Sequence, residues 1–392
     1  MDNLGTLRSR LDTVDRKLLE VLRERLETVA DIAQVKAEGL PFLRDHERET
    51  ELLARVEGWA RELGLDGFRT HEIFREIIAM SLKAQEEALL KREQVERSTR
   101  GARRVAFQGV EGSYSQIAAH KYFSVRSATM EFVGRRSFAE ALAMAESGDV
   151  GYAFLPIENT TAGSINQTYD LLRQTDLRIV GEEILHVRHC LLGLEGADPA
   201  GLRRVLSHPQ ALTQCSRFLA GLEGIELVAF EDTAAAAREV QRGADPTQAA
   251  IASFEAAEIY GLAVLREGIA DQEENWTRFV VISGLDIELD PRIPSKTSLV
   301  LTTPHREGAL AHCLHLLAAH GLNLTKLESR PVPSRPWEYL FYVDIEGALA
   351  SEAAALAIAE LRRECPYLRV LGSYPARTTA DGAVDRYRGR SE

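Results

Sequence analysis

The sequence predicts three regions of different fold class: an all-helical region, a larger α/β region and a small α+β region of ferredoxin-like order. Three observations support this prediction. Apolar residues recur at steps of three and four over residues 1–96, short apolar segments alternate with helical segments over 104–284, and a β-α-β-β-α-β order occupies 297–376. We therefore expect a multidomain protein with domain limits close to these ranges.

The composition restricts the partners of the chain. Its 392 residues carry a formal net charge of −12, with 45% hydrophobic and 27% charged residues. An acidic chain has no electrostatic reason to bind nucleic acid, and no run of 18 or more apolar residues predicts a membrane span. The N-terminus lacks the apolar segment of a signal peptide, and the four cysteines are widely spaced. We expect a cytoplasmic protein without a metal or another cofactor.

Turn-forming residues divide the helical region. Breaks near Gly39-Leu40-Pro41 and over 64–67 predict one helix of about 9 turns, a shorter helix, and a third that begins at about Gly67. The charged stretch Lys91–Arg104 is predicted to be a linker. The apolar stripe of the first helix runs through Leu4, Leu11, Val14, Leu18, Leu22, Val29 and Ile32.

Charged and polar residues interrupt the apolar stripes of all three helices. A buried cation without a partner is costly, so such residues need an explanation. One interpretation is a structural ion-pair network, or a first helix that is turned so that the charges reach solvent. The other is a cationic, polar cavity for a small dianion, which the number of positions favours. They are Arg8, Arg25, Lys36, Asp45, Arg48, Glu49, Ser81 and Gln85.

In the central region, polar segments follow four apolar strands and open helical segments. They are 112–115, 156–161, 207–210 and Ser253. The carboxyl ends of strands and the amino ends of helices are common sites for anionic ligands. For any single serine or threonine, a helix N-cap is the simpler interpretation. His208 is a candidate general acid, but next to Pro209 it is equally a structural residue.

The helical region resembles the chorismate mutase domain of bifunctional P-proteins. The resemblance is carried by LRSRLDTVDRKLLEVLRER and by the spaced residues that follow it, up to Gln85. It implies an interlocked homodimer in which Arg8 reaches the partner's site. Arg25, Lys36 and Arg48 would surround the carboxylates and the ether oxygen, Asp45 and Glu49 the ring hydroxyl, and Ser81 and Gln85 would complete the contacts, with Gln85 at the ether oxygen. Restraint of chorismate by such cations requires no cofactor.

The central region is similar to prephenate dehydratase through GVEGSYS, LPIENTTAGSIN, SHPQALTQC and NWTRFVV, with Val110 where many members have proline. The resemblance implies two lobes, as in periplasmic binding proteins. It places Thr277 at the leaving hydroxyl, which needs a hydrogen-bond donor because hydroxide leaves poorly. It implies further substrate contacts from Ser113, Glu158, Asn159, Thr160, Ser207 and Gln214.

The C-terminal region resembles the ACT domains that are fused to prephenate dehydratases. Two motifs carry this resemblance, Gly308-Ala309-Leu310 and Glu328-Ser329-Arg330-Pro331, and Trp337 also fits. They imply that L-phenylalanine binds at a subunit interface and inhibits the enzyme. The hypothesis is therefore an enzyme that converts chorismate to prephenate and prephenate to phenylpyruvate, as a homodimer or larger homo-oligomer. A sensor without activity, an enzyme that prefers arogenate, and the survival of one activity alone are the alternatives.

Overall fold

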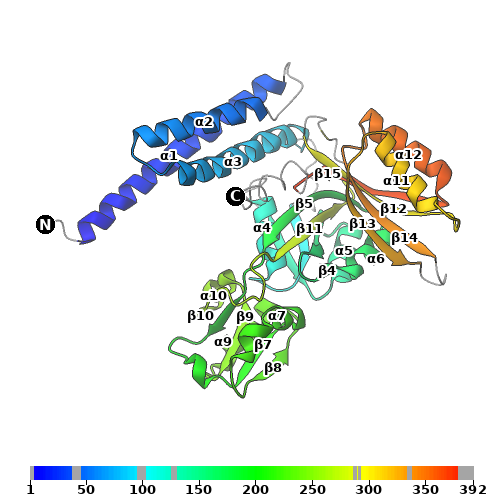
Figure 1. Cartoon of the computed structure of the whole chain (residues 1–392). Helices are drawn as coiled ribbons and strands as arrows, with labels where there is room; N and C mark the ends of the chain where they lie inside the picture. The colour runs from blue at the N-terminus through cyan, green and yellow to red at the C-terminus, as the bar shows by residue number, and fades with distance from the viewer. Residues whose placement is uncertain are drawn as a thin grey trace. The chain divides into compact units, whose positions relative to one another are not determined.

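The computed structural model describes residues 4–37, 46–94, 103–124, 130–285, 289, 293–332 and 338–377. The chain divides into two compact units, Met1–Arg97 and Ser98–Glu392 (Figure 1). Within the described residues, no helix has the length and the apolar character needed to cross a membrane.

The first unit consists of three helices, α1 (Leu4–Ala37), α2 (His46–Glu62) and α3 (Gly67–Gln94). The predicted helices and the break between α2 and α3 are confirmed. The predicted linker is wrong at its start, because Lys91–Gln94 belong to α3. Lys, Arg, Glu and Gln are good helix formers, so a charged stretch alone does not end a helix.

The core of the helical unit is small. Among its described residues, the buried apolar side chains are Val29, Val56, Ala60 and Ile78. The first half of α1 projects beyond the other two helices (Figure 1). Its predicted stripe is exposed in this chain, with Leu11 and Leu18 at 60% and 59% exposure. Nothing in the described part of the unit covers this stripe.

The second unit begins with two lobes, each built on a mixed sheet. In the first lobe the order is β2-β1-β3-β11-β5, with β4 paired to β3. The strands β1, β2 and β3 are parallel, and β11 runs antiparallel to both β3 and β5. The elements are β1 (Arg104–Gln108), α4 (Tyr114–Phe123), β2 (Glu131–Arg135), α5 (Phe138–Glu146), β3 (Tyr152–Asn159), β4 (Gly163–Ser164), α6 (Asn166–Gln174), β5 (Arg178–His186) and β11 (Trp276–Ser283).

The second lobe has the sheet order β10-β6-β9-β7-β8. Two crossover segments, 187–189 and 267–275, connect it to the first lobe. They run side by side, since Val187 N donates to Asn275 O at 2.7 Å and Ile269 N donates to His189 O at 3.2 Å. The elements are β6 (Cys190–Gly193), η1 (Pro199–Gly201), β7 (Arg204–Ser207), α7 (Pro209–Gln214), α8 (Ser216–Ala220), β8 (Glu226–Ala229), α9 (Thr233–Gly243), β9 (Gln248–Ala252), α10 (Phe254–Tyr260) and β10 (Ala263–Arg266).

One of the four predicted polar loops is a strand instead. Pro156–Asn159 form the end of β3, because β11 pairs with them in the register Thr277↔Asn159 and Arg278↔Glu158. A polar residue can stay in a strand when hydrogen-bonded groups satisfy its side chain. The loops that end at Ser113 and Ser253 do open helices, and both serines are N-caps.

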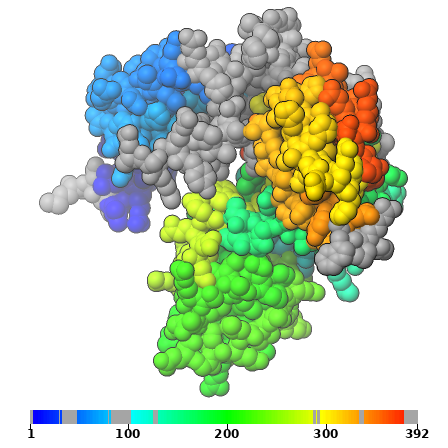
Figure 2. Space-filling model, turned by 45° about the vertical axis from the view of Figure 1, so that its right-hand side comes forward, coloured from blue at the N-terminus to red at the C-terminus, as the bar shows by residue number. Residues whose placement is uncertain are grey.

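The C-terminal part has the predicted β-α-β-β-α-β order and an antiparallel sheet, β13-β14-β12-β15. Its helices α11 and α12 cover one face, and α11 forms the outer surface in Figure 2. Close approach of β15 to β5 requires Gly372, because a Cβ there would overlap the backbone of Ile179. The elements are β12 (Ser295–Thr302), α11 (Ala309–Ala319), β13 (Leu324–Pro331), β14 (Tyr339–Glu346), α12 (Glu352–Glu364) and β15 (Tyr367–Pro375).

A buried ionic cluster joins the C-terminal sheet to the first lobe. The guanidinium of Arg278 donates to Glu182 at 2.7 Å, to Asp344 at 2.6 Å and to the hydroxyl of Tyr374 at 2.9 Å. Lys296 donates to Glu182 at 3.2 Å. Two buried cations therefore face two buried anions, so the net charge placed in the interface is near zero, which limits the cost of desolvation.

The surroundings of Glu182 determine its ionisation. Burial disfavours the charged form, but the attraction of Arg278 and Lys296 outweighs it and lowers the pKa of Glu182 to about 2. A carboxyl group with a lowered pKa in the folded state stabilises the fold at neutral pH. That contribution is lost as the pH falls from about 4.5 toward 2.

We expect Glu182→Gln to lower the free energy of unfolding of the second unit by about 3 kcal/mol at pH 7, because it leaves buried cations without their anion. The difference from wild type should shrink as the pH approaches 2. Urea denaturation at several pH values measures this. The matched control is Glu226→Gln, which breaks an exposed pair with Arg204 and should cost less than about 1 kcal/mol. An equal loss of unfolding free energy in both variants would contradict the role of Glu182 as the anion that the buried cations need.

Candidate functional sites

Arg25 and Ser81 form the part of the predicted helical site that the structure brings together. Ser81 is buried on α3 and donates to Ile77 O at 2.7 Å, so its oxygen is left to accept from the Arg25 guanidinium. Burial lowers the pKa of Arg25. Among the described residues, no carboxylate forms an ion pair with Arg25. A cation held by neutral acceptors keeps its charge available for an anionic ligand.

The other predicted residues of the helical unit are more dispersed. Arg8 is exposed on the first half of α1. On α2, Arg48 is exposed and lies 3.3 Å from Glu51, and Glu49 is half-buried. The side chains of Lys36 and Gln85, and all of Asp45, lie outside the described residues.

In the second unit, Thr277 and Asn159 meet across the β3–β11 pair. The Asn159 amide nitrogen donates to Thr277 Oγ1 at 2.9 Å and to Asn275 Oδ1 at 2.8 Å. The Asn159 side-chain oxygen accepts from the backbone N–H groups of Thr161 and Ala162 at 3.0 and 2.8 Å. These backbone donors fix which end of the Asn159 amide faces Thr277. Since Thr277 Oγ1 accepts from Asn159, its own proton is available to another group.

Gln214 brings the second lobe into this cluster. Its amide nitrogen donates to Thr161 Oγ1 at 2.5 Å and to Asn159 Oδ1 at 3.3 Å. Its oxygen lies 2.9 Å from His189 Nε2, and His189 Nδ1 lies 3.0 Å from the Tyr114 hydroxyl. We name the set Tyr114, Asn159, Thr161, His189, Gln214, Asn275 and Thr277 the Thr277 cluster.

Four members of the Thr277 cluster were missed by the sequence analysis. Thr161 and Asn275 lie inside the ENTT and NWTRF motifs, which contain the residues that were chosen. Tyr114 lies in the GSYS motif, while His189 belongs to none of the four motifs quoted. Asn275 is 1% exposed, and its amide nitrogen has no hydrogen-bond partner among the described residues. The cluster therefore presents hydrogen-bond donors rather than acceptors.

The remaining predicted serines and threonines of the dehydratase set lie outside the cluster. Ser113 caps α4 by accepting from Gln116 N at 3.3 Å. Ser207 donates to Ile251 O at 2.6 Å, and Thr160 donates to Glu274 O at 3.0 Å. His208 caps α7 by accepting from Gln210 N at 3.2 Å, which is a structural role. In this structure these groups are engaged with backbone atoms.

Glu158 faces the opposite side of the sheet from Asn159. Its carboxylate lies 2.8 Å from the Lys326 ammonium and 3.7 Å from the Arg278 guanidinium. Adjacent residues of a strand point to opposite faces. Thr277 and Asn159 therefore lie on the cluster side, while Arg278 and Glu158 face the C-terminal sheet.

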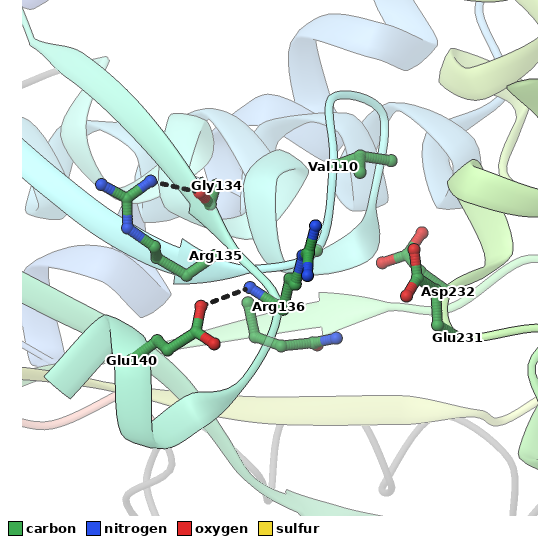
Figure 3. A pocket seen from close by; sticks show the side chains of 9 residues that line it. Val110, Gly134, Arg135, Arg136, Glu140, Glu231 and Asp232 are labelled. Carbon is green, nitrogen blue, oxygen red and sulfur yellow. Dashed lines mark hydrogen bonds between the residues drawn. The ribbon is translucent and has the colours of Figure 1, made fainter.

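A cavity of about 330 Å³ lies between the lobes, at the carboxyl ends of β1 and β2. In Figure 3, Glu231 and Asp232 lie opposite Arg135 and Glu140, with Arg136 between them. Arg135 donates to Gly134 O at 2.9 Å. Gly109 permits the close approach of the lobes, since its φ is +116° and a Cβ there would overlap Asp232 and Ser113. The cavity and the Thr277 cluster occupy the same edge of the first sheet, without sharing residues.

The predicted regulatory residues lie on two elements of the C-terminal part. Gly308 precedes α11 with φ of +73°, followed by buried Ala309 and half-buried Leu310. On β13, Glu328 accepts from Ser164 at 2.8 Å and Arg330 pairs with Asp170 at 3.0 Å, while Ser329 is exposed. Glu328 and Arg330 thus contact the first lobe. Trp337 lies outside the described residues.

The described residues contain no group of three or more His, Cys, Asp or Glu side chains that could hold a metal ion.

Comparisons with known proteins match both units. Residues 7–86 match the family model of chorismate mutase type II, and residues 105–286 match that of prephenate dehydratase. A bifunctional chorismate mutase/prephenate dehydratase of Enterobacter agglomerans is 39% identical over 95% of this chain and 96% of its own. Two solved structures are similar to this one. A quorum quenching acylase, GqqA, has a TM-score of 0.63 and 34% identity, covering 70% of this chain and 98% of its own. A prephenate dehydratase of Arthrobacter aurescens in complex with L-Phe has a TM-score of 0.62 and 28% identity, covering 73% and 97%.

Proposed function

Because the chain belongs to the family of bifunctional chorismate mutase/prephenate dehydratases, we propose which residues carry out its two activities and how the second is regulated. The protein is an enzyme of aromatic amino acid biosynthesis with both activities. It rearranges chorismate to prephenate, and it converts prephenate to phenylpyruvate, CO2 and water.

The mutase site is assigned to residues of two copies of the chain. Arg25, Lys36 and Arg48, with Asp45, Glu49, Ser81 and Gln85, would come from one copy, and Arg8 from the other. The exposed stripe of α1 supports this assignment, because Leu11 and Leu18, at 60% and 59% exposure, leave apolar surface that the described part of the unit does not cover. A second copy would cover the stripe and bring its own Arg8 to the site. Cations then stabilise the negative charge that grows on the ether oxygen as the C–O bond breaks.

Mixed dimers test the shared site. We expect Arg8→Met and Arg25→Met each to lower mutase activity by about 100-fold or more, because each removes a cation from the transition state. When the two variants are unfolded together and refolded, half the dimers should be mixed. Each mixed dimer has one intact site, so about a quarter of the wild-type rate should return. Refolding each variant alone is the control. No recovery, with dimers present by light scattering, would place Arg8 and Arg25 in the same copy's site.

Thr277 is assigned as the donor to the leaving hydroxyl of prephenate. Loss of CO2 leaves the electron pair of the C–C bond in the ring. The C4–O bond then breaks with its own pair, and the departing oxygen takes a proton to become water. The single observation that carries this assignment is the Asn159 hydrogen bond, which occupies Thr277 Oγ1 as an acceptor and directs its proton elsewhere. Gln214 completes the cluster. Ser113, Thr160 and Ser207 remain predicted contacts, and so does Glu158, although its carboxylate faces the C-terminal sheet in this structure. Arg136 in the neighbouring cavity supplies a cation for a carboxylate.

We expect Thr277→Val to lower dehydratase kcat by about 100-fold or more while mutase activity is unchanged, so that prephenate accumulates from chorismate. Thr277→Ser keeps the hydroxyl and should retain most of the rate. Absorbance assays of chorismate loss and phenylpyruvate formation measure both steps. A Val variant as active as the Ser variant would refute the role of the hydroxyl.

The C-terminal part is proposed to be an ACT regulatory domain that senses L-phenylalanine. A similar solved structure is in complex with L-Phe, which supports this ligand. Regulation needs a physical connection to the site. The two strands that hold Thr277 and Asn159 hold Arg278 and Glu158 on their other face, and these contact Asp344 and Lys326 of the C-terminal sheet. A shift of that sheet would therefore act on the catalytic strands. The proposed ligand residues remain Gly308, Ala309, Leu310, Glu328, Ser329 and Arg330.

Lys326→Met should weaken inhibition by L-phenylalanine, because it removes the contact between β13 and Glu158. We expect the concentration for half-inhibition to rise by about 5-fold or more, within the usual range of allosteric coupling. Dehydratase rate against phenylalanine concentration gives the value. Arg362→Met on the exposed face of α12 is the control and should respond as wild type does. An unchanged response in Lys326→Met would exclude this contact from the coupling.

The domain limits 1–96, 104–284 and 297–376 and a cytoplasmic location also remain proposals. Arogenate as a preferred substrate is tested by comparing its kcat/KM with that of prephenate.

A further inference from the structure

His189 is a buried titratable residue that the proposed mechanism does not use. It is 2% exposed and lies on the crossover segment 187–189, between the two lobes. Its two ring nitrogens contact different parts of the molecule. Nε2 faces Gln214 on α7 of the second lobe, and Nδ1 faces Tyr114 at the start of α4 in the first.

The direction of each hydrogen bond in the Thr277 cluster follows from the backbone. Two backbone N–H groups point at Asn159 Oδ1, so this atom is an acceptor and the amide nitrogen faces Thr277. Thr161 also donates its hydroxyl proton to Asn159 Oδ1, at 2.7 Å. Thr161 Oγ1 must then accept, so the Gln214 amide nitrogen faces it. The Gln214 oxygen is left facing His189, and only a protonated Nε2 can donate to it.

The tautomer of His189 is therefore determined. Burial lowers the pKa of His189, and in the neutral ring a proton on Nε2 leaves Nδ1 as an acceptor. The Tyr114 hydroxyl lies 3.0 Å from Nδ1. Burial raises the pKa of Tyr114, which keeps this hydroxyl protonated. That hydroxyl donates its one proton to Arg188 O at 2.7 Å, so the tautomer is fixed from the Gln214 side of the ring.

We propose that His189 is a positioning residue of the dehydratase site: its Nε2–H holds the Gln214 amide in the one orientation that supports Asn159 and Thr277. Without that donor the Gln214 amide is free to turn over. Its oxygen would then face Thr161 Oγ1 and Asn159 Oδ1, which are both acceptors in this arrangement. The inference rests on the proposed role of Thr277, through which His189 acts.

A pair of substitutions of similar shape tests the donor. His189→Met removes the N–H group, and His189→Gln places an amide nitrogen near the position of Nε2. We expect His189→Met to lower dehydratase kcat by about 10- to 100-fold with KM changed less than about threefold, since the reacting groups are misplaced rather than removed. His189→Gln should recover most of kcat. The mutase activity of the same molecules, which should not change, controls for folding. Equal loss in both variants would overturn the proposal.

A double-mutant cycle separates positioning from a general structural effect. In the Thr277→Val background, His189→Met should lower kcat by less than about twofold, because the group that it positions is already absent. A loss as large as in the wild-type background would show that His189 does not act through Thr277. The role of Thr277 itself is judged separately, from the rate of Thr277→Val alone.

The tautomer has a readout that does not depend on activity. In ¹⁵N-histidine-labelled enzyme, the His189 resonance is assigned by its loss in His189→Gln. Its two nitrogen shifts should show a protonated Nε2 and an unprotonated Nδ1. A protonated Nδ1 in the wild-type enzyme would overturn the proposal.

Discussion

The pairing of β3 with β11 is the constraint on which the second unit depends. Its register sets Thr277 beside Asn159 and Arg278 beside Glu158. Because successive side chains alternate between the two faces of a sheet, one pair faces the other lobe and the next pair faces the C-terminal sheet. A shift of one residue would exchange the faces and bury hydroxyl and amide groups where the ionic cluster now lies. The proposed catalytic residues and the contacts proposed for their control therefore share one stretch of backbone.

The charges of the protein act locally rather than through its net charge. The chain is acidic overall, yet Arg278 and Lys296 lie in the interface between two sheets and are balanced by Glu182 and Asp344. Arg25 in the helical unit has a different kind of surroundings. Its contacts there are a serine hydroxyl and a backbone carbonyl, so its charge is not neutralised by the described residues. The first arrangement joins two sheets, and the second leaves a cation that is available to an anionic ligand.

Sequence patterns predicted the elements well and the site in part. Apolar periodicity located the three helices, short apolar segments located four strands of the two lobes (β1, β3, β7 and β9), and the motifs led to Thr277, Asn159 and Gln214. Periodicity could not show that Pro156–Asn159 continue a strand, since that depends on pairing with β11, more than a hundred residues away. Nor could it reveal His189, because its role follows from which atoms of Gln214 and Tyr114 face its ring. Lys326, the nearer partner of Glu158, likewise comes from a distant part of the chain, the C-terminal sheet.

The nature of the Thr277 cluster restricts how a proton can reach the leaving hydroxyl. Dehydration with loss of CO2 consumes one proton per turnover, and Thr277 delivers it in the proposed mechanism. Behind Thr277 the described partners are amides, which orient hydrogen bonds but transfer protons poorly. The hydroxyl must therefore recover its proton from the side of the cleft. Thr277 is 8% exposed in this structure, so little of it contacts solvent. His189 lies on one of the two crossover segments, so in the proposed arrangement the orientation of the Gln214 amide depends on a residue that connects the lobes.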